Sequence, residues 1–326
     1  EILQRLSRRM KILYSMSNRL GAAELLQRLL KDPPADCKIR VAGYSSALAY
    51  LSKLDWTLDG VVYVPPNLAH SPKELAPFDH FNEEIENFNP DLVISDADML
   101  SAIVCQELAI PLWSVSPLHF LDGVIRGIER SHYQSTLSRS RDSLGRIKSK
   151  AIRCFIHSPF GSIRIPWKLK AGYEWMSPPI NLAKESNGGA KIALLSDPSR
   201  RNELIKVLSN LSTIPNNHLQ ASPEFYQQLR NSWCLTMGET GLITDAIQAR
   251  SFLAIVPKTS DPEATMNAVL CQELGLGQDL LQAELMLEYG MEDLEKSQEA
   301  QISNKLPTDL RFPTLKERIE EYARSI

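Results

Sequence analysis

The stretch CLTMGETGLITDAIQARSFLAIVPKTSDPEATMNAVLCQELGLG, residues 234–277, decides the fold. Short apolar runs rich in Leu, Ile, Val and Phe alternate in it with longer stretches of helical character, and glycines end the last of these. Strands that alternate with helices form parallel sheets whose helices cover both faces. We therefore predict a doubly wound α/β unit around this stretch.

The same alternation continues on both sides of it. In the second half we expect strands at 191–197, 232–238 and 251–257 and helices at 202–211, 242–249 and 265–277. In the first half we expect helices at 22–32 and 99–109 and strands at 11–17, 38–44, 58–64, 91–96 and 111–117. The segment 65–90 is polar and contains several prolines, so it is predicted as a loop outside the sheet.

Two doubly wound halves in a chain of 326 residues predict two domains. Their boundaries are placed at 1–178 and 188–312, with the Pro- and Gly-containing segment 173–189 as the linker. A C-terminal helix within 313–326 is expected to pack back on the first domain. Ligands bind beyond the carboxyl ends of parallel strands, so chemistry is predicted in a cleft between the domains.

The composition is that of a globular protein, with 43% hydrophobic residues, 23% charged residues and a formal net charge of -3. It excludes a disordered, collagen-like or coiled-coil chain. The five cysteines are widely spaced and form no CxxC pair, which argues against a disulfide framework and a zinc cluster. No apolar run approaches the roughly 20 residues that span a bilayer, so a cytoplasmic protein is expected.

Polar residues in the quoted stretch are placed to bind a nucleotide. The strand runs into Gly238 and Gly241, and the next helix begins near Thr240. Free N–H groups and the positive end of that helix then face the cleft, as in diphosphate sites. Asp245 follows one turn later, where it can accept hydrogen bonds from a ribose. After the next strand come three residues that can hold sugar hydroxyls: Asp261, Glu263 and Asn267.

This stretch resembles the nucleotide-sugar glycosyltransferases of the two-Rossmann (GT-B) architecture, especially the group of muramyl-lipid N-acetylglucosaminyltransferases. In that group a glycine turn, a Ser or Thr and an acidic residue precede an Ala-rich helix, a proline closes the next strand, and an acidic-Gln pair and Asn-Ala follow. Ala264 stands where the group has Gln. The matching residues are Gly241, Thr244, Asp245, Pro257, Glu263, Asn267 and Ala268.

The resemblance implies two Rossmann-like domains that face a cleft, with the acceptor bound by the first and a nucleoside diphosphate sugar, expected to be a UDP-sugar, by the second. By the same resemblance, Asp245 would hold the donor ribose, and Glu263 the donor sugar. Thr240 and Thr244 would bind the phosphates. No permanently bound cofactor is implied.

The catalytic His of many family members has no counterpart, because Ala22 stands at its expected position. Asp96 and Asp98 are the next candidates for a general base, since burial can raise the pKa of a carboxyl group toward neutrality. Helix capping explains either residue equally well. We prefer Asp96, and Glu24 ranks third.

A departing diphosphate must be stabilised by a metal ion or by fixed positive charge. The one Asp-x-Asp sequence on a plausible loop, 96–98, lies in the acceptor half, so a metal-free site is expected. Arg19 and either Arg200 or Arg201 follow the first strands of the two halves and are predicted to point toward the cleft. A solvated surface position is the alternative for each of them.

The segment 126–174 is basic, with eleven Lys or Arg against three carboxylates, and aromatic residues lie among the charges. This pattern is typical of surfaces that bind phosphates and stack on bases, and a solvated basic helix explains it as well. Duplex DNA and an anionic membrane surface are the partners considered. The predicted acceptor-binding residues are Arg139, Arg141, Arg146, Lys148, Lys150 and His119.

These features favour an enzyme that transfers a sugar from a nucleoside diphosphate sugar to an acceptor hydroxyl. A hydroxylated base in DNA is the sharpest form of the acceptor, by analogy with glucosyltransferases of viral DNA that share the architecture. A membrane-peripheral transferase acting on a lipid-linked sugar is the competing enzyme. A catalytically silent sugar-nucleotide-binding protein is the alternative from a different class.

Overall fold

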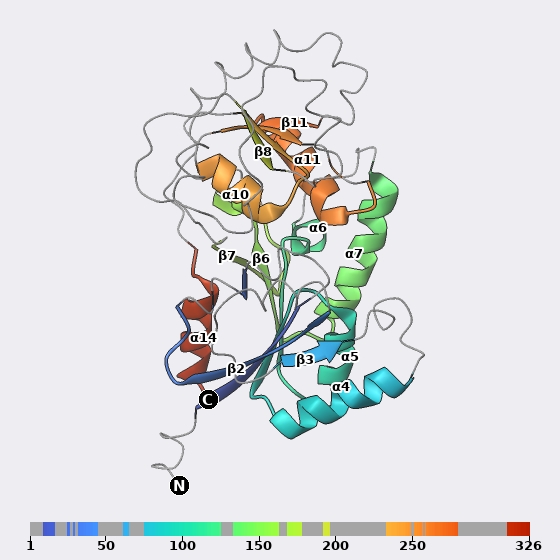
Figure 1. Cartoon of the computed structure of the whole chain (residues 1–326), viewed down its shortest axis with the longest axis vertical. Helices are drawn as coiled ribbons and strands as arrows, with labels where there is room; N and C mark the ends of the chain where they lie inside the picture. The colour runs from blue at the N-terminus through green and yellow to red at the C-terminus, as the bar shows by residue number, and fades with distance from the viewer. Residues whose placement is uncertain are drawn as a thin grey trace.

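The computed structural model contains two parallel sheets, one in each half of the chain (Figure 1). The residues that it describes are 9–16, 25–26, 29, 32–44, 61–64, 75–124, 133–162, 168–177, 192–195, 233–248, 251–255, 257, 259–279 and 312–326. The predicted helix 202–211 lies outside them. Within this part of the chain, no helix is long and apolar enough to cross a bilayer.

The first sheet has seven parallel strands in the order β3-β2-β1-β4-β5-β6-β7. β2 and β3 lie on one side of β1 and β4 to β7 on the other, which confirms the predicted doubly wound order. Strands that are buried on both faces consist of continuous apolar runs. This is why β4 and β5 could be predicted from the sequence. The bounds are β1 Met10–Ser15, β2 Cys37–Tyr44, β3 Val61–Val64, β4 Leu92–Ser95, β5 Leu112–Val115, β6 Arg153–His157 and β7 Tyr173–Met176.

The last two strands of this sheet were not predicted. β6 lies in the basic segment, and β7 lies at the start of the predicted linker. Their charged residues pair with each other, since Arg153 Nε lies 3.2 Å from Glu174 Oε1. Because each strand contains a charged residue, a search for continuous apolar runs did not predict either of them.

The prediction of a loop at 65–90 was wrong, because most of this segment forms a helix, α4 (Leu75–Phe88). Pro77 lies in its first turn, where a missing N–H costs nothing, and Pro90 follows its end. Ile85 and Phe88 are buried beside the sheet. The other helices of the first half are α5 (Met99–Glu107), α6 (His119–Gly123), α7 (Gln134–Lys148) and the short 3-10 helix η2 (Pro159–Ser162).

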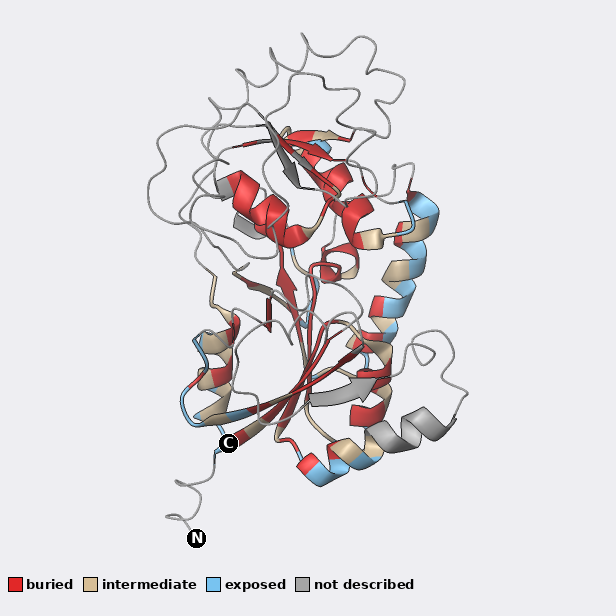
Figure 2. Cartoon of the chain, in the orientation of Figure 1, coloured by how far each residue is buried: buried red, intermediate tan, exposed pale blue. Residues whose placement is uncertain are grey.

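The second sheet has four parallel strands in the order β11-β10-β9-β8. Its helices α10 (Thr240–Gln248) and α11 (Pro262–Glu273) follow β9 and β10, as the quoted stretch predicted. α10 and most of α11 are buried, as Figure 2 shows. The strands are β8 Ile192–Leu195, β9 Trp233–Thr236, β10 Phe252–Ile255 and β11 Gly277–Asp279.

One cluster of buried apolar residues spans both halves, and two further clusters lie in the first half. A single cluster of buried residues joins Leu118, Phe120 and Leu144 of the first half to residues of the second, including Ile243 and Leu253. α7 borders both halves along the side of the molecule in Figure 1. Just before its first turn the Tyr133 hydroxyl donates a hydrogen bond of 2.7 Å to Asp279 Oδ2, and the Thr136 hydroxyl donates one of 3.3 Å to the carbonyl of Thr259.

The C-terminal helix α14 (Leu315–Ala323) packs on the first sheet (Figure 1). Leu315 and Ile319 are buried among residues of β1, β5 and β6. Arg318 Nη2 lies 3.0 Å from Glu174 Oε2 on β7. Thr314 caps the helix, in a reciprocal capping box with Glu317. The chain therefore returns from the second half to complete the core of the first.

The docking of α14 can be tested by truncating its central side chain. Because Ile319 is fully buried, Ile319→Ala should lower the free energy of unfolding by about 2 to 5 kcal/mol, the range for removing a buried aliphatic side chain. Arg324→Ala at the exposed end of the same helix is the matched control and should change it by less than about 0.5 kcal/mol. Urea unfolding measures both, and equal small effects would contradict the docking.

Candidate functional site

The turn between β9 and α10 approaches α11 closely. Gly238 has φ +104°, in the region that favours glycine. A Cβ at this position would lie 2.8 Å from the Cα and 2.9 Å from the carbonyl oxygen of Ala264. Only glycine therefore allows the turn to lie against the first turn of α11.

The side chain of Asn267 on α11 holds this turn. Its Nδ2 donates hydrogen bonds to the carbonyl of Gly238 at 2.8 Å and to Thr240 Oγ1 at 3.0 Å. Asn267 is fully buried, and its Oδ1 has no hydrogen-bond partner among the described residues. The structure thus brings together three of the predicted donor residues, and leaves a buried acceptor beside them.

A carboxylate occupies the N-terminal end of α10. The backbone N–H of Thr240 donates to Glu263 Oε1 at 3.1 Å, and Glu263 is itself buried. Asp261 is the N-cap of α11 and accepts from the backbone N–H groups of Glu263 and Ala264. A ligand phosphate that binds the Thr240 N–H must therefore displace Glu263.

Glu239 is a residue of this site that the sequence analysis missed. It lies between the turn and α10, and burial raises the pKa of its carboxyl to about 7. Its Oε2 accepts a hydrogen bond of 2.9 Å from the Thr236 hydroxyl, whose oxygen accepts from the N–H of Gly238. The nearby carboxylates of Glu263 and Asp261 raise the pKa further. Its place one residue before Thr240 was the available signal.

The other donor residues predicted on α10 lie inside the protein. The Thr244 hydroxyl donates to the carbonyl of Thr240 at 2.7 Å, within the helix. Asp245 is 2% exposed and acts on the buried thiol of Cys234, whose pKa is raised by burial first and by Asp245 second. Gly241 is buried in the first turn. All three residues are therefore buried in this conformation.

The two aspartates after β4 have different surroundings. Asp98 caps α5, because its Oδ2 accepts from the Ser101 N–H at 3.0 Å and from the Ser101 hydroxyl at 2.8 Å. Asp96 is 2% exposed at the carboxyl end of β4, and its N–H donates to the carbonyl of Ser15 on β1. Ala97 between them has φ +47°. The capping alternative therefore describes Asp98.

The basic segment presents less charge to solvent than its composition suggests. Arg139 and Arg146 are exposed on α7. Arg141 Nε donates to the carbonyl of Leu121, and Lys148 Nζ lies 4.6 Å from the centre of the Tyr173 ring. Lys150 bonds to the side chain of Gln106. Four aromatic residues of the segment that the structure describes are buried in the core and are not available to stack on bases: Tyr133, Phe155, Phe160 and Tyr173.

His119 is fully buried. Its Nε2 lies 2.7 Å from Ser114 Oγ, and its ring centre lies 5.6 Å from that of Tyr173. The Tyr173 hydroxyl donates to Asp122, which lowers the pKa of that carboxyl against the opposing effect of burial, with help from Lys170. The predicted acceptor residue His119, at the start of α6, is thus in contact with Ser114 and Tyr173 inside the protein.

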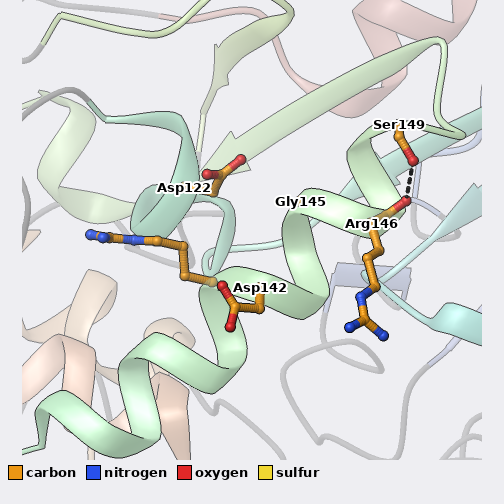
Figure 3. A pocket seen from close by; sticks show the side chains of 6 residues that line it. Asp122, Asp142, Gly145, Arg146 and Ser149 are labelled. Carbon is orange, nitrogen blue, oxygen red and sulfur yellow. Dashed lines mark hydrogen bonds between the residues drawn. The ribbon is translucent and has the colours of Figure 1, made fainter.

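A hollow of about 540 Å³ lies beside α7 (Figure 3). Arg141 and Arg146 line it together with Asp122 and Asp142, so its charge is mixed. Figure 3 shows Asp122, Asp142 and Arg146 spread along the hollow, and their side chains do not converge on one point. The hollow therefore lacks the concentrated positive charge that a phosphate-binding groove needs.

Several predicted residues lie outside the described part of the chain: Arg19, Ala22, Glu24, Arg200 and Arg201. Among the residues that the structure does describe, no three His, Cys, Asp or Glu side chains are grouped to hold a metal ion.

No protein-family model matches the chain, and a comparison with curated proteins finds no similar sequence. Solved structures do match over nearly the whole length. CalG4, the calicheamicin glycosyltransferase, is 15% identical with a TM-score of 0.57, covering 98% of this chain and 99% of its own. The spinosyn rhamnosyltransferase SpnG, bound to spinosyn aglycone, is 11% identical with a TM-score of 0.60, covering 96% and 100%.

Two further similar structures contain nucleotides. SsfS6, a glycosyltransferase of Streptomyces sp. SF2575, is complexed with thymidine diphosphate and is 13% identical with a TM-score of 0.57, covering 97% of this chain and 100% of its own. S. aureus MnaA, in a co-structure with UDP, is 11% identical with a TM-score of 0.59, covering 97% and 98%. These likenesses do not single out the group of muramyl-lipid N-acetylglucosaminyltransferases that the sequence resembles. They show that the chain has the GT-B fold, two Rossmann-like domains in sequence.

Proposed function

We propose that the chain transfers a sugar from a nucleoside diphosphate sugar to a hydroxyl group of an acceptor. The observation that carries this proposal is the convergence of Thr240, Glu263 and Asn267 at the carboxyl ends of β9 and β10, in a chain with the GT-B fold. Ligands of parallel sheets bind at that edge. UDP and thymidine diphosphate in structures of the same fold support a nucleotide ligand.

In the proposed donor complex, the diphosphate accepts hydrogen bonds from the free N–H groups at the start of α10. Glu263 then turns from the Thr240 N–H to hydroxyl groups of the sugar. Asp245 is proposed to hold the ribose, which requires its carboxylate to turn out of the packed position described above. Arg19 and Arg200 are proposed to neutralise the departing diphosphate, and a UDP-sugar is the proposed donor.

The proposed chemical step uses a carboxylate of the first domain. Asp96 accepts the proton of the acceptor hydroxyl while that oxygen forms a bond to the anomeric carbon. The bond between the anomeric carbon and the phosphate oxygen breaks, and the diphosphate leaves with the electron pair. The position of Asp96 directly after β4 supports this assignment, because ligands of parallel sheets bind at the carboxyl ends of the strands.

The acceptor is proposed to bind along α7. The exposed guanidinium groups of Arg139 and Arg146 support a polyanionic acceptor, of which DNA with a hydroxylated base is tested first. A lipid-linked hydroxyl is the alternative acceptor. Incubation with labelled sugar nucleotides decides between an enzyme and a silent binder, since an enzyme shows at least slow hydrolysis of its donor.

The role of Glu263 predicts a difference between two ligands. Glu263→Ala should weaken binding of the intact sugar nucleotide by about 1 to 3 kcal/mol relative to free UDP, because hydrogen bonds to the sugar are lost. Free UDP should bind as well as before, since the Thr240 N–H no longer has a competing acceptor. Calorimetry with both ligands checks this. Glu273→Ala at the exposed end of α11 is the control, and equal losses for both ligands would contradict a sugar-facing role.

The chemical step predicts a contrast between two neighbouring aspartates. Asp96→Asn should lower turnover by roughly 100-fold or more with donor affinity unchanged, because an amide cannot take the proton. Asp98→Asn should keep normal turnover, since Asn caps a helix as well as Asp. Single-turnover assays with the labelled donor measure both. Normal turnover in the Asp96 variant would remove it from the mechanism.

The acceptor surface predicts a dependence on salt. If α7 binds duplex phosphates, the log-log slope of affinity against salt should be about -0.9 per phosphate that the protein neutralises. Replacing Arg139 and Arg146 by Gln together should flatten the slope by about two units, with donor hydrolysis unchanged. Fluorescence anisotropy with labelled DNA measures the slope. Labelling of a lipid-linked acceptor, with none of hydroxymethylated DNA, would reject the DNA proposal.

A further inference from the structure

The start of α10 is an acidic environment, although the ligand proposed to bind there is an anion. Glu239 comes directly before the helix, and Asp261 and Glu263 come from the first turn of α11. The Thr240 N–H already donates to a carboxylate oxygen of Glu263. The inference drawn from these groups rests on the proposed donor site, and concerns how that site tolerates a diphosphate.

The pKa of the Glu239 carboxyl is raised, because burial and two neighbouring carboxylates outweigh the hydrogen bonds from its own N–H and from the Thr236 hydroxyl. The charged groups that act on it in the described part of the chain are Glu263 and Asp261, both acidic. Cys234 on β9 is buried nearby, and the charges of both Asp245 and Glu239 act on its thiol. The one side-chain donor that it uses is the neutral hydroxyl of Thr236.

The buried Oδ1 of Asn267 adds another acceptor to the same place. It has no hydrogen-bond partner among the described residues, whereas its Nδ2 is used by Gly238 and Thr240. The turn therefore presents oxygen acceptors to a diphosphate, whose own oxygens are also hydrogen-bond acceptors. A proton on one of these groups both removes a like charge and supplies a donor.

We propose that the site binds a nucleoside diphosphate sugar together with a proton on Glu239, so that donor affinity falls as the pH rises above neutrality. The other two carboxylates already have roles in the donor complex, since Asp261 caps α11 and Glu263 is assigned to hydroxyl groups of the sugar. Glu239 is the carboxyl group of the site without such a role, and it takes up the proton. The protonated carboxyl can donate to a phosphate oxygen.

The direction of the pH effect follows from the raised pKa of Glu239, about 7 without a ligand. Below that value the carboxyl is already neutral, and donor affinity is at its full value. Above it a proton must be taken up, so the affinity falls by up to about tenfold per pH unit until the pKa of the complex is reached.

The experiment measures binding of UDP-glucose and dTDP-glucose to the whole chain by isothermal titration calorimetry between pH 5.5 and 8.5. Sugar nucleotides are used because their phosphates keep a constant charge over this range, unlike those of free UDP. Repetition in buffers with different ionisation enthalpies counts the protons taken up. We expect the dissociation constant of the wild type to rise about tenfold or more from pH 6 to 8.5.

Glu239→Gln, which is neutral at every pH, should bind without proton uptake and with the same affinity across the range. Glu273→Gln, at the exposed end of α11, should keep the pH dependence of the wild type. Circular dichroism shows whether each variant is folded. Wild-type affinity that does not change with pH, or a pH dependence that survives in Glu239→Gln, would overturn the inference while leaving the donor site in place. If neither nucleotide binds any folded variant at any pH, the proposed donor site is wrong and the inference falls with it.

Discussion

The hydrogen bonds from the Asn267 carboxamide to the turn of Gly238 and Thr240 are the contact on which the proposed site depends. They join the start of α10 to α11, and so fix two strand-to-helix connections relative to each other. Because Gly238 lies directly against Ala264, there is no room for a side chain at position 238. This contact therefore helps to set the positions of Glu239 and Glu263, and the direction in which the N-terminal end of α10 points.

Much of the fold could be predicted because buried parallel strands are apolar along their whole length. β4, β9 and β10 and the helices that follow them were found in this way. α4 was missed, since its prolines suggested a loop, although one lies in its first turn and another beyond its end. β6 and β7 were missed because their charges satisfy each other in the fold, which no local pattern reveals.

The site could be predicted less completely than the fold. Spacing alone brought Thr240, Glu263 and Asn267 together, since residues after neighbouring parallel strands meet at one edge. The raised pKa of Glu239 could not be foreseen, because it depends on burial and on carboxylates from a different helix. For the basic segment, the sequence overestimated the charge that is available to a ligand. Arg141 contacts a carbonyl, Lys150 a side-chain amide and Lys148 an aromatic ring.

The apolar cluster that spans both halves, together with the hydrogen bond from Tyr133 to Asp279, also bears on how the protein unfolds. Domains with separate cores can unfold separately, whereas halves joined by one apolar cluster unfold together when that cluster is disrupted. The chain should therefore show a single cooperative melting transition. A nucleotide that binds the second half would then raise the melting temperature of the first half by the same amount, although it makes no contact there.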